Sequence, residues 1–394
     1  MGKHIAFVNI PAIGHVYPTL GVAAELVRRG HRVTYSSVGR RTGAIESTGA
    51  TALPYESTRP SDTDREVRAP GRTTYLTASL LGFLAEAEKV LPQIEPALRA
   101  DPPDLVVFDR MAFAGRILAE KMGLPTVQSW VVMVSNEHWS LGSLLDGFDV
   151  EDPDFVAFVN RLEAFVGEQG LALTPTEFLT PVACRDLAYY PRAFQYAGDR
   201  FDDQVCFVGP CARPPLPGPT WQPPADGRPV VLVTLGTIYN RDVDFYRHCV
   251  AAFADSAWHA VIAVGERTDP AEVGPTPDNV EVHQLVPQLD VLDHAAMFVS
   301  HAGMGGIMEA LRVGVPLIAV PQTLEQEANA SRIEELALGA RISPGEVTPQ
   351  GLRDTVDRLA KDETVAQGVA IMRQHVLESG GAPRAADAVE ACLR

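Results

Sequence analysis

Short apolar runs alternate with amphipathic stretches along most of the 394 residues. In the N-terminal half, the runs predict buried strands at residues 4–10, 31–36, 105–108 and 126–134, with a helix at residues 18–29. In the C-terminal half, they predict strands at residues 230–235, 260–264, 280–285, 297–300 and 317–320, with helical patterns between them. Strands that alternate with helices are typical of parallel, doubly wound sheets. The predicted fold class is therefore α/β, with one such sheet in each half.

A proline-rich segment at residues 212–229 separates the two halves, and seven of its eighteen residues are proline. Because proline lacks an N–H donor and fixes φ, this segment can form neither a helix nor a central strand. We therefore predict a semi-rigid linker between an N-terminal domain, residues 1–211, and a C-terminal domain that begins at residue 230.

One amphipathic stretch in the first half is open to two interpretations. Residues 154–166 carry apolar side chains at positions that share one face of a helix. Core packing is the ordinary explanation of such a face, and the lining of a hydrophobic ligand pocket is the alternative.

The composition disfavours several classes of protein. The 33 basic and 50 acidic residues give a net charge of −17, which disfavours binding to nucleic acid and to anionic membrane surfaces. No apolar stretch approaches the ~18 residues of a membrane-spanning helix, and the N-terminal apolar block is too short for a secretory signal. We therefore expect a cytoplasmic protein without membrane insertion. The five cysteines show no CxxC spacing, so we expect reduced thiols, with neither a disulfide nor a zinc site.

The strongest chemical signal is a glycine-rich turn between a predicted strand and a helix, in the segment FVSHAGMGGIME at residues 298–309. A helix N-terminus offers unpaired N–H groups and a partial positive charge, and glycines let an anion approach the backbone closely. The glycines are Gly303, Gly305 and Gly306. Because the segment contains no Lys or Arg, a bound diphosphate would depend on backbone amides and His301. The alternative is a tight turn whose glycines serve packing alone.

Other nucleotide-binding patterns are missing from the sequence. A dinucleotide fingerprint that starts at Gly303 would need a third glycine at position 308, which is Met308. Neither GxxxxGK[ST] nor GxSxG occurs. A nicotinamide-dependent dehydrogenase, a P-loop ATPase and an α/β-hydrolase are therefore disfavoured.

A second signal joins two residues at the carboxyl ends of predicted strands. His15 lies in the predicted turn after the first strand, and Asp109 directly follows the strand at 105–108. Parallel sheets bind ligands at this edge, and an imidazole with a carboxylate behind it is a suitable base near neutral pH. Taken singly, a solvated histidine and an aspartate that caps a turn are the alternatives.

Further loops follow strands in the second half and face the same predicted edge of the sheet. They contain Thr237, the segment 286–288, Gln322, and the pair Glu325 and Gln326. Each is an ordinary loop by itself, and their convergence on one edge is what indicates a binding site.

In order and spacing, these segments resemble the bacterial macrolide family of UDP-dependent glycosyltransferases, which have the GT-B fold. The likeness extends over nearly the whole chain. It rests on NIPAIGHVYPTL at 9–20, FVGP at 207–210, VPQ at 286–288, VSHAGMGG at 299–306 followed by a glutamate, VPQTLEQE at 320–327, and Gly380–Gly381 before a last helix.

The resemblance implies two Rossmann-like, doubly wound domains that face each other across a cleft. Residues 1–211 would bind the acceptor, residues 230–378 would bind the donor, and residues 379–394 would form a helix that returns to the first domain. The implied reaction transfers a hexose, expected to be glucose, from a UDP-sugar to a hydroxyl of an apolar acceptor such as a macrolide or flavonoid, with inversion. No metal and no cofactor besides the donor is expected, and the protein would be a monomer or homodimer.

The resemblance also implies roles for single residues. His15 would remove the proton from the acceptor hydroxyl, and Asp109 would orient His15 and balance its charge. The acceptor would lie against residues 60–85 and 130–180. On the donor side, the uracil would lie near Leu285, Val286 and Gln288, and the ribose would bind to Glu309. The diphosphate would bind to Thr237, His301 and the backbone amides of Gly303, Gly305 and Gly306. The sugar would bind to Glu325 and Gln326.

Three positions depart from the family pattern. Leu285 stands where many relatives have a tryptophan, which removes a stacked indole from the base. Tyr17 replaces an asparagine near the sugar phosphates. Glu325 replaces an aspartate, and its longer side chain affects the choice of sugar.

Two other functions remain open on a similar fold. A nucleotide-sugar epimerase would bind UDP but would need no hydrophobic acceptor. The arrangement of His15 and Asp109 argues against this function. A non-catalytic partner of another glycosyltransferase would be expected to have lost His15, Asp109 or His301, and the sequence retains all three.

Overall fold

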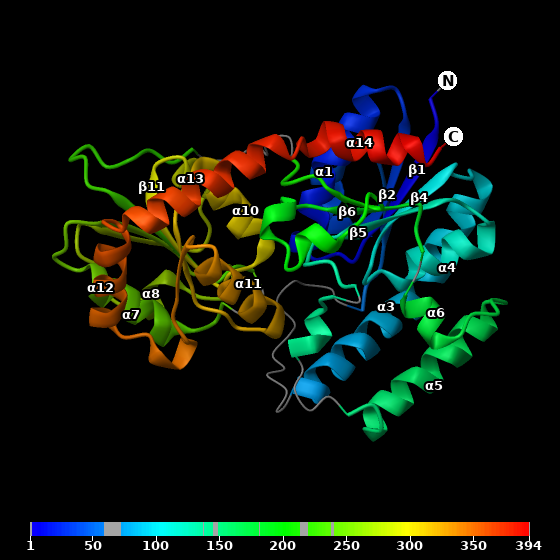
Figure 1. The fold of residues 1–394 in the computed structure, drawn as a ribbon, viewed down its shortest axis with the longest axis horizontal. Coiled ribbons are helices and arrows are strands. Elements are labelled where there is room, and N and C mark those ends of the chain that lie inside the picture. The colour runs from blue at the N-terminus through cyan, green and yellow to red at the C-terminus, as the bar shows by residue number, and fades with distance from the viewer. Residues whose placement is uncertain are drawn as a thin grey trace. The chain divides into compact units, whose positions relative to one another are not determined.

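The computed structural model describes residues 2–58, 72–136, 138–144, 149–180, 182–212, 220–237 and 240–393. The chain forms two compact α/β units (Figure 1). The first comprises Met1–Tyr189, Asp199–Leu216 and Ser379–Arg394, and the second comprises Tyr190–Gly198 and Pro217–Glu378. Residues 213–219 of the predicted linker and residues 60–71 of a predicted acceptor segment lie outside the described residues.

The first unit is built on a seven-stranded parallel sheet in the order β3-β2-β1-β4-β5-β6-β7. Its strands are β1 (His4–Val8), β2 (Arg32–Val38), β3 (Thr51–Tyr55), β4 (Leu105–Asp109), β5 (Thr126–Trp130), β6 (Arg185–Ala188) and β7 (Val205–Phe207). The apolar pattern predicted β1, β2, β4 and β5 and missed the other three, because β3 is a partly exposed edge strand and β6 and β7 are very short. The strand order reverses between β1 and β4, which is where such sheets bind ligands.

Helices cover both faces of this sheet. They are α1 (Ile13–Arg28), α2 (Thr42–Glu46), α3 (Arg72–Ala100), α4 (Phe113–Met122), α5 (Pro153–Glu168), α6 (Pro175–Leu179) and α14 (Gly381–Ala391). One core lies between the sheet and α3, α4 and α5, and a second lies between the sheet and α1 and α14. Phe158 and Leu162 of α5 are buried in the first core, so the core-packing interpretation of that helix face is confirmed.

The second unit is built on a six-stranded parallel sheet in the order β10-β9-β8-β11-β12-β13, which reverses between β8 and β11. Its strands are β8 (Val230–Thr234), β9 (His259–Ala263), β10 (Val280–His283), β11 (Ala295–Ser300), β12 (Leu317–Ala319) and β13 (Gly339–Arg341). All but the three-residue β13 were predicted.

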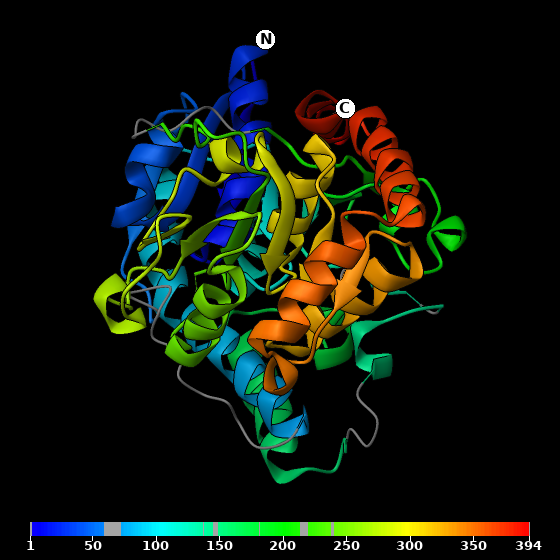
Figure 2. The same ribbon diagram turned by 90° about the vertical axis from the view of Figure 1, so that its left-hand side faces the viewer.

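The helices of the second unit are α7 (Val243–Phe253), α8 (Pro270–Val273), α9 (Gln288–Leu292), α10 (Met304–Val313), α11 (Leu324–Glu335), α12 (Pro349–Leu359) and α13 (Glu363–Glu378). Helix α12, orange in Figure 2, packs against the yellow-green α7, and α13 packs against α10. Short 3-10 turns lie at Gly39–Arg41, Leu141–Leu144, Arg192–Phe194, Gly198–Arg200 and Pro344–Glu346. No helix within the described ranges is long and apolar enough to cross a membrane.

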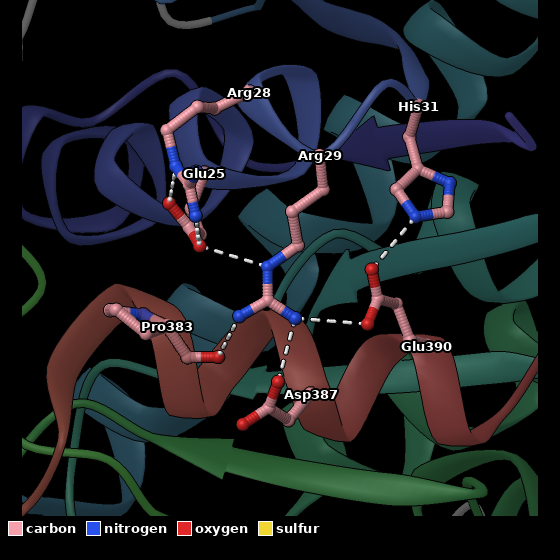
Figure 3. Close-up of polar contacts among 7 residues, drawn as sticks. All are labelled: Glu25, Arg28, Arg29, His31, Pro383, Asp387 and Glu390. Carbon is pink, nitrogen blue, oxygen red and sulfur yellow. Dashed lines mark hydrogen bonds and ion pairs between the residues drawn. The ribbon is translucent and has the colours of Figure 1, made fainter.

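The C-terminal helix α14 docks in the first unit beside α1, and Figure 3 shows the polar contacts that hold it. The guanidinium of Arg29, at the end of α1, donates to Asp387 at 2.6 Å, to Glu390 at 2.9 Å and to the carbonyl of Pro383 at 2.9 Å. The ring of His31 lies 3.0 Å from the other carboxylate oxygen of Glu390. This network orients α14, while its alanine and valine side chains contribute to the second core.

Two of the five cysteines form a disulfide, so the expectation of reduced thiols throughout is wrong. Cys184 precedes β6 and Cys392 follows α14, and they are bonded although 208 positions separate them in the sequence. The fold packs α14 against β6, and the spacing of the cysteines along the chain does not indicate which distant segments come into contact. Cys206, Cys211 and Cys249 are free thiols.

Candidate active site

His15 and Asp109 meet at the point where the strand order of the first sheet reverses. Asp109 is the last residue of β4, and His15 follows β1. The sequence placed His15 in a turn, but it lies in the first turn of α1, where its N–H donates to the carbonyl of Ala12 at 3.0 Å. Tyr17 is half-buried on the same helix, and the guanidinium of Arg41 lies 6.0 Å from its ring centre.

The contact between the two side chains fixes the chemistry of the imidazole. Nδ1 of His15 lies 2.6 Å from Oδ2 of Asp109, and Oδ1 of Asp109 accepts the backbone N–H of Met111 at 2.7 Å. The carboxylate side chain is 1% exposed and the imidazole is 16% exposed. Because a carboxylate accepts the Nδ1 proton, Nε2 keeps its lone pair and can take a proton from a ligand.

A buried chain of side chains holds the first turn of α1, and the sequence analysis missed it. The amide of Asn9 donates to the carbonyl of His15 at 3.0 Å and to the hydroxyl of Tyr35 at 2.9 Å. The Tyr35 hydroxyl lies 2.6 Å from that of Thr19, which donates to the carbonyl of Val16 at 2.8 Å. Burial raises the pKa of Tyr35, so it remains a phenol. An asparagine directly after a fully buried strand was the available signal.

In the second unit, His301 lies at the corresponding reversal of strand order, directly after β11. A Cβ atom added at Gly236, which follows β8, would lie 2.4 Å from the ring of His301, and one added at Gly303 would lie 2.5 Å from Nε2. These two glycines therefore make room for the imidazole. Burial lowers the pKa of His301 to about 4, so the ring is neutral at physiological pH and donates from one nitrogen. Thr237 lies half-buried one residue beyond Gly236.

The N-terminus of α10 begins directly after His301. Gly303 is its N-cap residue and makes no side-chain hydrogen bond, and the first bond within the helix runs from Ile307 N–H to the carbonyl of Gly303. The preceding amides, including those of Gly305 and Gly306, have no partner within the helix. A Cβ at Gly305 would meet nothing within 4 Å. An open helix N-terminus beside a neutral imidazole is suited to a phosphate group.

The residues predicted for the base and ribose lie in the loop before α9, at the start of α9 and on α10. The amide of Gln288, the first residue of α9, donates to a carboxylate oxygen of Glu309 on α10 at 2.6 Å. Leu285 is 61% exposed, which is high for a large apolar side chain, and Val286 is half-buried. The pairing of Gln288 with Glu309 brings together two of the predicted donor residues.

The predicted sugar-binding residues begin α11. Glu325 is half-buried, and the side-chain oxygen of Gln326 accepts the backbone N–H of Gln322 at 2.7 Å. Asn329, which the sequence analysis missed, is fully buried one helical turn later and donates to Glu325 at 3.1 Å and to the carbonyl of Ala302 at 2.9 Å. Its spacing of four from Glu325 was the available signal.

The predicted residues thus fall into two sets. His15 and Asp109 lie in the first unit, and all the predicted donor residues lie in the second unit, in the loops and helices that follow β8, β10, β11 and β12. Two separate Rossmann-like units, each with polar groups at its own reversal of strand order, have the architecture of the GT-B glycosyltransferases, and the chain is a glycosyltransferase of this class.

Comparison with known proteins gives the family. The sequence model described as "Erythromycin biosynthesis protein CIII-like, C-terminal domain" matches residues 249–393. NDP-glycosyltransferase YjiC of Bacillus licheniformis is 39% identical over 99% of this chain and 98% of its own length. Demethyllactenocin mycarosyltransferase of Streptomyces fradiae is 40% identical over 99% of this chain and 86% of its own length. The solved structure of the calicheamicin glycosyltransferase CalG4 has a TM-score of 0.87, 38% identity, and coverage of 100% of this chain and 98% of that one. The chain belongs to the bacterial macrolide family of glycosyltransferases.

Proposed function

We propose that the protein is an inverting O-glycosyltransferase that moves a hexose from a UDP-sugar to a hydroxyl of an apolar natural product in the cytoplasm. The observation that carries the proposal is the 2.6 Å contact between His15 and Asp109 at the sheet edge. Two similar proteins are a demethyllactenocin mycarosyltransferase and a calicheamicin glycosyltransferase, and these names support a small-molecule acceptor. The expectation of glucose as the sugar comes from the family resemblance.

In the proposed reaction, Nε2 of His15 takes the proton of the acceptor hydroxyl as its oxygen attacks the anomeric carbon. The bond from that carbon to the diphosphate oxygen breaks, UDP leaves with the electron pair, and the configuration inverts. Asp109 stabilises the imidazolium that forms, because its carboxylate already accepts the Nδ1 proton.

The leaving diphosphate gains negative charge, and fixed dipoles can stabilise it without a required metal. The amides at the start of α10 and the neutral ring of His301 are the groups proposed for this task. Gln288 and Glu309, paired at 2.6 Å, are proposed to hold the nucleoside, and Glu325 and Gln326 the sugar hydroxyls.

The test is UDP release from UDP-glucose by the purified protein, with and without EDTA, against a panel of macrolides and flavonoids. Mass spectrometry identifies the products, and NMR gives the anomeric configuration. Acceptor-dependent UDP release, with a β-linked hexose on the product and no effect of EDTA, is the expected result. Binding of UDP-glucose without transfer to any acceptor would contradict the proposed donor–acceptor pairing, and transfer that EDTA abolishes would contradict the proposed metal independence.

A further inference from the structure

Arg110 directly follows Asp109 and holds its guanidinium over an aromatic ring. Its backbone N–H donates to the carbonyl of Ser129 at 3.3 Å, so the residue continues the pairing of β4 with β5. The guanidinium carbon lies 4.3 Å from the ring centre of Trp130, the last residue of β5. A cation over the face of an indole is attracted by the ring and is fixed in orientation. Arg110 therefore presents a fixed guanidinium at the sheet edge that carries the proposed base.

Within the part of the chain that the structure describes, Arg110 makes neither a side-chain hydrogen bond nor an ion pair. The nearby carboxylate of Asp186, on β6, accepts the indole N–H of Trp130 at 3.1 Å and attracts Arg110 only at longer range. Burial lowers the pKa of Arg110, and the attraction of Asp186 and Asp109 opposes this effect.

Two other arginines of the same unit pair with carboxylates of the protein. Arg116 on α4 is paired with Glu120 at 2.9 Å, and Arg29 is paired with Asp387 and Glu390. A guanidinium has five donors in a planar fork that matches a carboxylate. Arg110 is half-buried, and a carboxylate on a bound ligand would supply the partner that Arg116 and Arg29 have within the protein.

The geometry points to Arg110 as a residue that selects the acceptor by binding a carboxylate or other anionic oxygen on it. This inference rests on the proposed function and names the acceptor class more closely: an apolar, hydroxylated ring system that carries an acidic oxygen. The indole of Trp130 fixes the guanidinium, and the anion occupies its free donors. The hydroxyl that His15 deprotonates would lie on the same acceptor, because Asp109, the partner of His15, and Arg110 both lie at the carboxyl end of β4.

The experiment compares 2-naphthol with 3-hydroxy-2-naphthoate and 6-hydroxy-2-naphthoate, which present a carboxylate at two distances from the hydroxyl. Equilibrium binding is measured by calorimetry, separately from transfer of sugar. We expect the wild-type protein to bind at least one naphthoate about tenfold more tightly than 2-naphthol. Arg110→Met should reduce this preference by about 10- to 100-fold and leave the affinity for 2-naphthol unchanged. Arg110→Lys, which keeps the charge and loses the fork, should retain part of the preference.

Arg116→Met is the matched control, because it removes a buried arginine of the same unit that has its own carboxylate partner. It should lower the melting temperature and leave the preference for the naphthoates intact. An equal loss of affinity for all three compounds in Arg110→Met, or an unchanged preference, would overturn the proposal. If no compound accepts sugar while the preference and its dependence on Arg110 persist, the proposed transfer is wrong and the anion site stands.

Discussion

The side-chain amide of Asn329 donates to the backbone carbonyl of Ala302 at 2.9 Å, and so ties α11 to the turn that carries His301. Ala302 has a φ of 62°, a left-handed conformation that costs a residue with a Cβ atom free energy. The same amide donates to Glu325 at 3.1 Å. One buried asparagine thus positions the turn proposed for the diphosphate and the carboxylate proposed for the sugar.

Replacing Asn329 by alanine should therefore weaken donor binding without any direct contact to the donor. Loss of two hydrogen bonds should raise the dissociation constant of UDP-glucose by about tenfold or more, and that of UDP by less, because Glu325 is proposed to contact the sugar alone. Calorimetry with both ligands tests this expectation. Asn279→Ala is the matched control, since buried Asn279 also donates to two backbone carbonyls, of Phe253 and Trp258, at 2.8 Å. If both variants lose affinity equally, Asn329 has no special role.

Removal of the proposed base should affect transfer and spare donor binding. His15→Ala should lower kcat by at least about 100-fold, the usual contribution of a general base, with an unchanged affinity for UDP. Asp109→Asn should also lower kcat, because an amide stabilises neither the required tautomer nor the imidazolium. Stopped assays of product formation and calorimetry with UDP give the two quantities. Undiminished turnover of His15→Ala would remove His15 from the mechanism.

The opposite pattern is expected for His301. Its pKa of about 4 keeps the ring neutral, so we expect it to contribute a single hydrogen bond to the diphosphate rather than a charge. His301→Ala should raise the dissociation constant of UDP by about tenfold, and that contribution should be constant between about pH 6 and 8. His294→Ala, at an exposed position of the same unit, serves as the control. A loss of UDP affinity that depends on pH in this range would indicate a charged His301 instead.

Asp186 should make the stability of the protein depend on pH. Burial raises its pKa from 3.8 to about 6, although the Trp130 indole N–H and Arg110 oppose this. The folded state thus binds the proton more tightly than the unfolded state, so stability falls as the pH rises from 3.8 through about 6. The cost at neutral pH is about 3 kcal/mol at most.

Asp186→Asn removes this cost and keeps an oxygen that can accept from Trp130. Its free energy of unfolding should exceed that of the wild-type protein at about pH 7.5, and the difference should shrink towards zero near pH 4. Urea unfolding at several pH values measures it. A variant whose destabilisation grows as the pH rises would show that the attraction of Arg110 for the Asp186 carboxylate outweighs the desolvation.

The disulfide between Cys184 and Cys392 should stabilise the docking of α14 on the first unit. Because the bond closes a loop of more than two hundred residues, its loss should lower the free energy of unfolding by about 2–4 kcal/mol. Cys392→Ser should lower the melting temperature, and reduction of the wild-type protein should lower it by about as much as this substitution does. Cys206→Ser, at a free thiol, is the control and should have little effect. A melting temperature that reduction leaves unchanged would argue against the bond.

The pairing of His15 with Asp109 could be predicted, because the carboxyl ends of neighbouring parallel strands meet at one edge. The start of α1 could not. Proline favours the first position of a helix, so Pro18 indicated a start there, yet the helix begins five residues earlier at Ile13. The amide of Asn9, which lies outside the helix, donates to the carbonyl of His15 and to the hydroxyl of Thr19, and that hydroxyl donates to the carbonyl of Val16. These hydrogen bonds hold the extra turn. No local pattern contains that information.

The sequence by itself determined the alternation of strands and helices, the two parallel sheets and the edge at which each places its polar residues. These features follow from apolar periods of a few residues, which are local. Only the tertiary structure decided that Gly236 makes room for His301, that Asn329 holds Ala302, that Cys392 reaches Cys184, and that the guanidinium of Arg110 stacks on Trp130. These contacts are between segments far apart in the chain, so they depend on how the whole chain packs. Burial decides which polar groups need partners, and packing decides which partners are within reach.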